Sequence, residues 1–222
     1  MNALLVCAAP TPGSAGLVGR LASSADLIIA VDGGGAVCRE AGVRPDILVG
    51  DFDSLDSSLV DEFVSAGVRV VEFPADKDQT DLALALDVAR REGVDRVTVT
   101  AATTGRLDHT LAVAGTLAAA ADLQPRLREP ELRGWVVSTA LVSRLTLKGQ
   151  GATVSILAPG WNATVSVRGV RWPLAKAELA PLSDLGMSNV ITDGAGAVIE
   201  VHAGTVLVLS PHVAVAPAVE VG

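Results

Sequence analysis

The sequence lacks tyrosine altogether, and its three phenylalanines and three tryptophans bring the aromatic share to only 3% of 222 residues. A hydrophobic core must therefore be built mainly from alanine, valine, leucine and isoleucine. Hydrophobic residues are plentiful at 50% of the chain, whereas charged residues make up 19%. This balance excludes a disordered chain and predicts one that buries a sizeable core.

Basic residues are also scarce, with 17 Lys and Arg against 25 Asp and Glu and a formal net charge of −8. Nucleic acids and anionic membranes both need a basic face, so we expect neither as a partner. No apolar stretch reaches the length that spans a bilayer. The apolar run at the N-terminus has no basic residues before it and breaks at Pro10, which predicts a strand rather than a signal peptide.

Cysteine is limited to Cys7 and Cys38, which lie too far apart for the spacing of a zinc site. We expect both to be buried free thiols, as is usual in a reducing cytosol. Together with the missing signal peptide, this predicts a cytoplasmic protein.

The first half of the chain alternates short apolar runs with stretches of helical periodicity. The predicted strands are residues 3–8, 27–31, 47–49, 69–73 and 96–101, and the predicted helices are 15–22, 57–66, 80–92 and 107–121. Fully apolar strands separated by helices indicate a parallel sheet covered on both faces. We therefore predict a three-layer α/β domain over residues 1–140.

The second half has short strands separated by Gly, Pro and Asn, and no convincing helix follows any of them. These strands are predicted at residues 136–138, 141–147, 152–157, 163–167, 190–192, 197–201 and 205–209. Such strands close most naturally into a β-sandwich or barrel. We predict a smaller antiparallel β-sandwich domain over residues 141–222, with an end from residue 211 that is loose or partly ordered.

Carboxylates gather where the predicted parallel strands end. They are Asp32 after the second strand, Asp51 and Asp53 after the third, and Asp76, Asp78 and Asp81 after the fourth. Ligands of open parallel sheets bind at this edge, and converging carboxylates repel one another unless a cation is present. For Asp51 and Asp53, metal binding is the better interpretation, and Mg²⁺ suits an all-oxygen set. Asp46 and Asp56 are interpreted as turn and capping residues.

Two further segments have the composition of phosphate-binding turns. The glycine-rich turn Asp32-Gly33-Gly34 would let backbone N–H groups approach an anion or nucleotide, although such turns often merely begin a helix. Arg106 precedes a predicted helix and is suited to bidentate phosphate binding. Asp108 caps that helix or orients Arg106, two interpretations that the sequence leaves open. His109 is interpreted as structural rather than as a general base.

Four segments in this order resemble the thiamine pyrophosphokinase family. They are GDFDS at residues 50–54, KDQTD at 77–81, TGRLDH at 104–109 and the stretch from 171 to 189 that contains RWPL and GMSN. The resemblance runs from the glycine turn to the last strand, and it implies an α/β domain followed by a β-sandwich. It also implies transfer of the pyrophosphoryl group of ATP to the hydroxyl of thiamine, giving thiamine diphosphate and AMP.

The resemblance further implies which residues do this chemistry. Mg²⁺ would be held by Asp51, Asp53 and Asp81, and Lys77 and Arg106 would stabilise charge on the transferring group. The expected nucleotide contacts are Asp32, Gly33, Gly34, Asp78, Thr80, Arg106 and Asp108. Thiamine would meet Trp172, Ser188 and Asn189 in a homodimer whose sites are shared between protomers. Trp135 and Trp161 are assigned to packing.

The chain departs from the family pattern at three positions, where Ala36, Val113 and Val190 replace polar residues. These changes leave two alternatives open. One is a related pyrophosphokinase acting on another alcohol, such as a hydroxymethylpterin. The other is a nucleotide-binding homologue with weakened catalysis.

Overall fold

A computed structural model describes residues 1–53, 55–76, 78–103, 105–211 and 219–221 of the chain. The chain forms two compact units, the first made of Met1–Thr116 with Leu127–Pro130 and the second of Leu117–Arg126 with Glu131–Gly222. The division falls near residue 130 rather than at 140. The reason is that strand β7 (Leu132–Ser138) pairs along its whole length with β14 (Thr205–Pro211) of the second unit.

The first unit is built on parallel strands in the order β5-β1-β2-β3-β4, with β6 beside β5. Their bounds are β1 Asn2–Val6, β2 Leu27–Val31, β3 Ile47–Gly50, β4 Arg69–Glu72, β5 Arg96–Thr100 and β6 Arg126–Glu129. The three central strands β1, β2 and β3 are almost entirely buried, which explains why their sequences are apolar on both faces.

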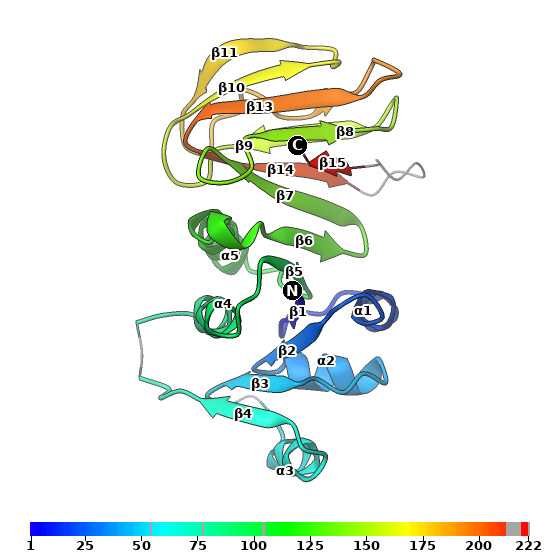
Figure 1. Ribbon diagram of the computed structural model, residues 1–222, viewed down its shortest axis with the longest axis vertical. Coiled ribbons are helices and arrows are strands. Elements are labelled where there is room, and N and C mark those ends of the chain that lie inside the picture. Colours follow the sequence, from blue (N-terminus) through cyan, green and yellow to red (C-terminus); the bar gives the residue numbers. More distant parts are fainter. Residues whose placement is uncertain (54, 77, 104, 212–218, 222) are drawn as a thin grey trace. The chain divides into compact units, whose positions relative to one another are not determined.

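Helices lie on both sides of this sheet (Figure 1), with α1, α2 and α3 on one side and α4 and α5 on the other. Their bounds are α1 Ser14–Ala22, α2 Gly34–Glu40, α3 Ser57–Ser65, α4 Asp81–Arg91 and α5 Leu107–Ala119. One hydrophobic cluster joins Leu4 and Val6 of β1 to Val18 of α1, Cys38 of α2 and Phe63 of α3. The predicted three-layer arrangement is therefore confirmed.

Local capping explains where two of the helices begin. Asp56 precedes α3, and its carboxylate accepts a hydrogen bond from the Ser58 N–H at 2.9 Å. Thr80 precedes α4, and its hydroxyl accepts one from the Ala83 N–H at 3.3 Å. The predicted capping role of Asp56 is thus confirmed.

The second unit is a β-sandwich of two antiparallel sheets. One has the order β12-β9-β14-β7 and the other β11-β10-β13-β8-β15. The remaining bounds are β8 Arg144–Leu147, β9 Thr153–Leu157, β10 Ala163–Arg168, β11 Leu174–Leu179, β12 Asn189–Val190, β13 Ala197–Ala203 and β15 Val219–Val221, with a 3₁₀ turn at Ala121–Leu123. A single cluster of buried residues, including Trp135, Ile156, Val167, Ile199 and Val208, fills the space between the sheets.

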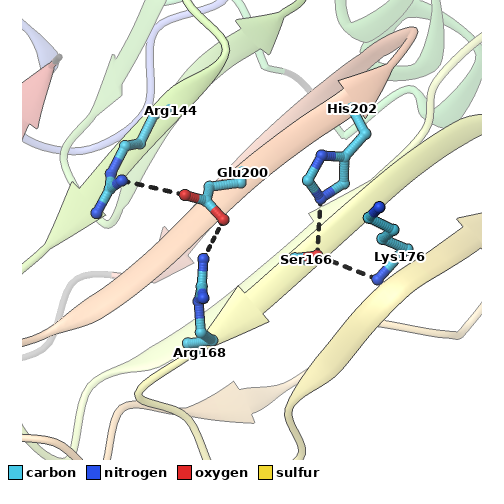
Figure 2. A network of polar contacts seen from close by, with 6 residues as sticks. All are labelled: Arg144, Ser166, Arg168, Lys176, Glu200 and His202. Carbon is cyan, nitrogen blue, oxygen red and sulfur yellow. Dashed lines mark hydrogen bonds and ion pairs between the residues drawn. The ribbon is translucent and has the colours of Figure 1, made fainter.

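The outer face of the second sheet is polar and internally paired. Figure 2 shows Glu200 between two arginines, with Arg144 Nη1 at 3.1 Å from its carboxylate and Arg168 on the other oxygen. Beside it, Ser166 Oγ lies 2.7 Å from His202 Nε2 and accepts the backbone N–H of Lys176 on edge strand β11 at 3.1 Å (Figure 2). The alternation of buried and exposed residues along β10 and β13 follows from this one-sided burial.

Several sequence-based expectations need correction. The end of the chain, predicted to be loose or partly ordered, contains a strand, because residues 219–221 form β15 and pair with β8. Trp161 is not a packing residue, since 87% of its surface is exposed, whereas Trp135 is buried as predicted. Helix α2 and strands β6 and β11 were not predicted, because they are short or lack a clear apolar period.

Both cysteines are buried free thiols, as predicted. Among the described residues, no helix is both long and apolar enough to cross a membrane.

Candidate functional site

Three carboxylates meet at the carboxyl ends of β2 and β3. Asp32 follows β2, and Asp51 and Asp53 follow β3. One oxygen from each of the three lies within 4.8 Å of the others. Strands β2 and β3 are hydrogen-bonded neighbours, so the parallel register brings these residues to one place.

The backbone at this edge is turned sharply so that the carboxylates converge. Asp32 and Phe52 both have left-handed backbone conformations, with φ of 48° and 59°. A left-handed conformation is costly for a bulky residue such as Phe52, and such outliers cluster at functional sites. Its turn places Asp51 and Asp53 on the same side, where the Asp53 N–H donates to Asp51 Oδ1 at 3.4 Å.

The electrostatics of the cluster follow from this crowding. The negative charge of Asp51 raises the pKa of Asp53 above its ordinary range, with smaller contributions from burial and from the charges of Asp32 and Asp81. The three-carboxylate arrangement is therefore costly when all members are ionised. A divalent cation would remove that cost.

Next to the cluster lies a cavity of about 340 Å³, which shares Asp32 with it. Its lining includes the polar side chains of Asp32, Thr80, Asp81, Arg106, His109 and Thr116. The rest comes from the segment after β1, from Val31 and Leu82, and from the apolar face of α5. This volume is at the lower end of the range for small-molecule sites. The cavity belongs entirely to the first unit.

Only some residues of the KDQTD segment line the cavity. Asp81 begins α4 and lines the cavity together with Thr80. Asp78 is exposed and does not belong to the lining, and Lys77 lies outside the described residues. The predicted metal set Asp51, Asp53 and Asp81 is thus near the observed cluster, but the third member of the close group is Asp32.

Arg106 is held by Asp108. The sequence left open whether Asp108 orients Arg106 or caps the helix. Arg106 Nη2 lies 2.7 Å from Asp108 Oδ2, and its Nε donates to Oδ1 at 3.3 Å. This pairing raises the pKa of Arg106 and lowers that of Asp108. Both side chains are largely exposed, so the ion pair contributes little stability but fixes the direction of the guanidinium.

The glycine turn is shaped by packing. A Cβ on Gly34 would lie 1.9 Å from the carbonyl oxygen of Val6, so only glycine fits at this position. A Cβ on Gly35 would meet the side chains of Phe63, Leu48 and Leu55 at 3.1–3.3 Å. Whether Gly33 and Gly34 also contact a nucleotide stays a prediction.

The structure adds residues to the cavity that the sequence did not indicate. Cys7, Ala8 and Ala9 follow β1 and form one wall. Val113 of α5, already singled out as a departure from the family pattern, lines it as well. The position of residues 7–9 at the end of the central strand could have been found from the rule that ligands bind beyond strand ends.

In the second unit, the three predicted thiamine contacts form one small assembly. Asn189 is buried, and its side chain bonds both backbone groups of Trp172, accepting from the N–H at 3.0 Å and donating to the carbonyl at 2.7 Å. Trp172 is 54% exposed, and the Arg171 guanidinium lies 5.1 Å from its ring centroid. Ser188 is exposed, and its N–H donates to Ser155 Oγ at 2.9 Å. Asn189 therefore holds the backbone of Trp172 through both its amide oxygen and its amide nitrogen. Whether it also contacts thiamine stays a prediction.

The chemistry of the acidic cluster fits Mg²⁺. Carboxylate oxygens are the ligands this hard cation takes, and it usually uses only one or two of them together with phosphate and water. Asp32, Asp51 and Asp53 provide such oxygens within one ion's reach. Nitrogen and sulfur ligands, which would favour zinc, are absent from this described cluster.

Fold and site together define a class: a protein of an α/β unit and a β-sandwich, with an acidic, arginine-bearing cavity at the carboxyl edge of the parallel sheet. The family model described as thiamin pyrophosphokinase, catalytic domain, matches residues 18–128, which is half of the chain. The chain belongs to the thiamin pyrophosphokinase family.

Individual relatives agree with this assignment. The chain is 39% identical over 85 residues to thiamine pyrophosphokinase of Bacillus subtilis, a match that covers 38% of this chain and 40% of the relative. It is 25% identical over 170 residues to thiamine pyrophosphokinase 2 of Arabidopsis thaliana, covering 68% and 60% of the two chains. The matches therefore span less than two thirds of these relatives' lengths.

Solved structures show the same fold. The crystal structure of the Bacillus subtilis enzyme superimposes with a TM-score of 0.76 at 22% identity and covers 96% of this chain and 100% of that chain. At this identity the likeness shows the fold alone.

Proposed function

We propose that this protein is an ATP-dependent thiamine pyrophosphokinase that produces thiamine diphosphate and AMP. Family membership supports the reaction type and favours thiamine over a pterin acceptor. The observation that carries the proposal is the acidic cluster of Asp32, Asp51 and Asp53 beside the cavity that Arg106 lines. Opposite charges placed in this way suit a polyphosphate bound together with a divalent cation.

In the proposed reaction, the thiamine hydroxyl oxygen forms a bond to the β-phosphorus of ATP. The bond from that phosphorus to the oxygen bridging to the α-phosphate breaks, and AMP leaves. Mg²⁺, when bound by Asp32, Asp51 and Asp53, with Asp81 close by, would neutralise the phosphate charge. Arg106 binds a phosphate oxygen in the orientation that Asp108 maintains.

The hydroxyl proton needs an acceptor. An aspartate of the cluster is better suited than His109, because carboxylates already surround the region where phosphate charge would be held. His109 lines the cavity, and among the residues described here its Nδ1 has no hydrogen-bond partner.

For the acceptor, we propose that thiamine stacks on Trp172 and hydrogen-bonds with Ser188, both exposed on the second unit. Asn189 supports this site by holding the Trp172 backbone. The proposal includes a cytoplasmic homodimer in which each thiamine surface serves the partner's nucleotide site.

The test is a turnover assay with purified protein, ATP, Mg²⁺ and thiamine, followed by chromatography for AMP and thiamine diphosphate. Formation of both in equal amounts is expected. AMP formed only with another alcohol would replace thiamine as the acceptor. ATP binding without any AMP would mean a nucleotide-binding protein and would refute the proposal.

A further inference from the structure

Glu129 is a buried carboxylate that the proposed reaction does not use. It ends β6, and only 7% of its surface is exposed. Its two oxygens accept three consecutive backbone N–H groups, from Ala101 at 3.2 Å, Ala102 at 2.8 Å and Thr103 at 3.1 Å. The Thr103 hydroxyl also bonds the same carboxylate.

The backbone that Glu129 binds is strained. Ala101 directly follows β5 and has a left-handed φ of 52°, although it is completely buried and is not glycine. Turning the chain in this way aligns successive N–H groups toward one point and creates an anion-binding concavity. The Glu129 carboxylate occupies that concavity, so the strained turn and the buried charge stabilise each other.

Burying this charge has a cost that a purely structural contact would avoid. Burial raises the pKa of Glu129, while the N–H groups of Ala102, Thr103 and Ala101 lower it, and burial has the larger effect. Three neutral acceptors or an apolar contact would hold a chain segment without that penalty. The negative charge of the Glu129 carboxylate therefore suits the three backbone N–H groups that point toward it.

The anchored turn leads directly into the cavity. Residues 101–106 connect β5 to α5, and Arg106 and His109 at the start of that helix line the cavity. On the other side, the Ala9 N–H donates to the Ala101 carbonyl at 2.8 Å, and Ala9 lines the same cavity. Glu129 thus fixes a segment that supports two walls of the site.

The charge of Glu129 also reaches the cavity. Cys7, another lining residue, has its pKa raised first by burial and then by the charges of Glu129 and Asp81. Cys7 and Asp81 line the cavity, and the charge of Glu129, outside the lining, acts on Cys7.

We infer that Glu129 is a positioning residue for nucleotide binding: its carboxylate holds the Ala101–Thr103 turn so that Arg106 meets the polyphosphate of ATP. This inference rests on the proposed function for the identity of the ligand. Glu129 lies 23 residues beyond Arg106 in the chain, and the fold brings it to the turn that precedes Arg106.

The test compares Glu129→Gln and Glu129→Ala with Glu131→Gln, a control that removes an exposed carboxylate two residues away. In Glu129→Gln, the side-chain amide would present an N–H donor to one of the three backbone donors and release the turn. We expect the Kd of ATP with Mg²⁺, measured by calorimetry without thiamine, to rise about 10- to 100-fold in both Glu129 variants. The KM for thiamine and the behaviour of the Glu131 variant are expected to stay near those of the unmodified protein.

Rescue gives a readout that a structural role alone would not move. Added formate can place a carboxylate in the space that Glu129→Ala leaves, and it is expected to restore much of the ATP affinity of that variant but not of Glu129→Gln. Unchanged ATP affinity in folded Glu129 variants, with only a lower melting temperature, would overturn the inference.

Two safeguards keep the result decisive. If the Glu129 variants do not fold, Thr103→Val removes only the hydroxyl contact, and it is expected to weaken ATP binding to a smaller extent; no weakening would overturn the inference. If the unmodified protein binds ATP but makes no thiamine diphosphate, the proposed function fails while the binding measurements still decide the role of Glu129.

Discussion

Replacing Gly34 by alanine tests whether the glycine turn exists for packing or for a nucleotide. The new Cβ would lie 1.9 Å from the Val6 carbonyl oxygen, about 1.5 Å short of an ordinary contact. Val6 ends β1, which is hydrogen-bonded on both sides by β2 and β5, so the strand has little freedom to retreat. Gly34 itself is held in α2.

Because the obstacle is backbone rather than a flexible side chain, the cost should be at the upper end for overpacking, about 3–5 kcal/mol. For a chain of this length that corresponds to a melting temperature lower by roughly 10 °C. The assay is thermal unfolding followed by circular dichroism, with ATP affinity measured well below the transition.

Two further glycines calibrate the result. Gly35→Ala meets only side-chain atoms of Phe63, Leu48 and Leu55 at 3.1–3.3 Å, which can move, so a loss of about 1 kcal/mol is expected. Gly115→Ala, in α5 with open space around it, should instead stabilise by about 0.5–1 kcal/mol. A Gly34→Ala protein that melts like the unmodified chain and loses only ATP affinity would refute the packing explanation.

The other predictions concern the site and the buried thiols. Asp51→Asn should reduce turnover by at least about 100-fold while leaving melting nearly unchanged, because it removes a carboxylate from the proposed metal set; equal turnover and unchanged Mg²⁺ dependence would contradict this. The same variant should bring the pKa of Asp53 down toward its ordinary value, since the Asp51 charge is the largest cause of the increase. Because the carboxyl pKa of Asp53 is raised in the folded state, the metal-free protein should lose stability as the pH rises from the ordinary carboxyl range through the raised pKa. Urea titrations at several pH values should show a smaller loss in Asp51→Asn. Mixing refolded Asp51→Asn and Trp172→Ala chains should restore about a quarter of the sites if sites are shared across a homodimer, and none if each chain works alone. Cys7 and Cys38 should resist a thiol reagent at pH 8 until the chain unfolds, because burial raises both thiol pKa values, that of Cys38 to about 12; rapid reaction of the folded protein would show that these thiols are accessible.

Most of the fold was predictable because its signals are local. The central strands are continuous apolar runs of four or five residues, such as Leu27–Val31, and their burial on both faces produces that pattern directly. Strand β6 and helix α2 were not predicted, because their local signals are weak. Arg126–Glu129 has a single apolar residue among three charged ones, and Gly34–Glu40 begins with two glycines, which are poor helix formers.

The candidate site, too, was predictable only in part. The sequence alone determined that carboxylates and an arginine follow the ends of parallel strands, because strand polarity sends every such residue to one edge of the sheet. It did not determine which carboxylates meet. Asp32 joins Asp51 and Asp53 because β2 and β3 pair in register, and two left-handed residues aim the side chains.

Only the tertiary structure decided the roles of Asn189 and Glu129. Asn189 had been predicted to contact thiamine, and the fold commits its amide to the backbone of Trp172, 17 residues away. The sequence does not indicate that Glu129 is buried, since an acidic residue at the end of a short charged strand is ordinarily exposed. Glu129 can accept the three backbone N–H groups only because the fold brings residue 129 next to residues 101–103. A local sequence pattern does not show which distant segments lie together.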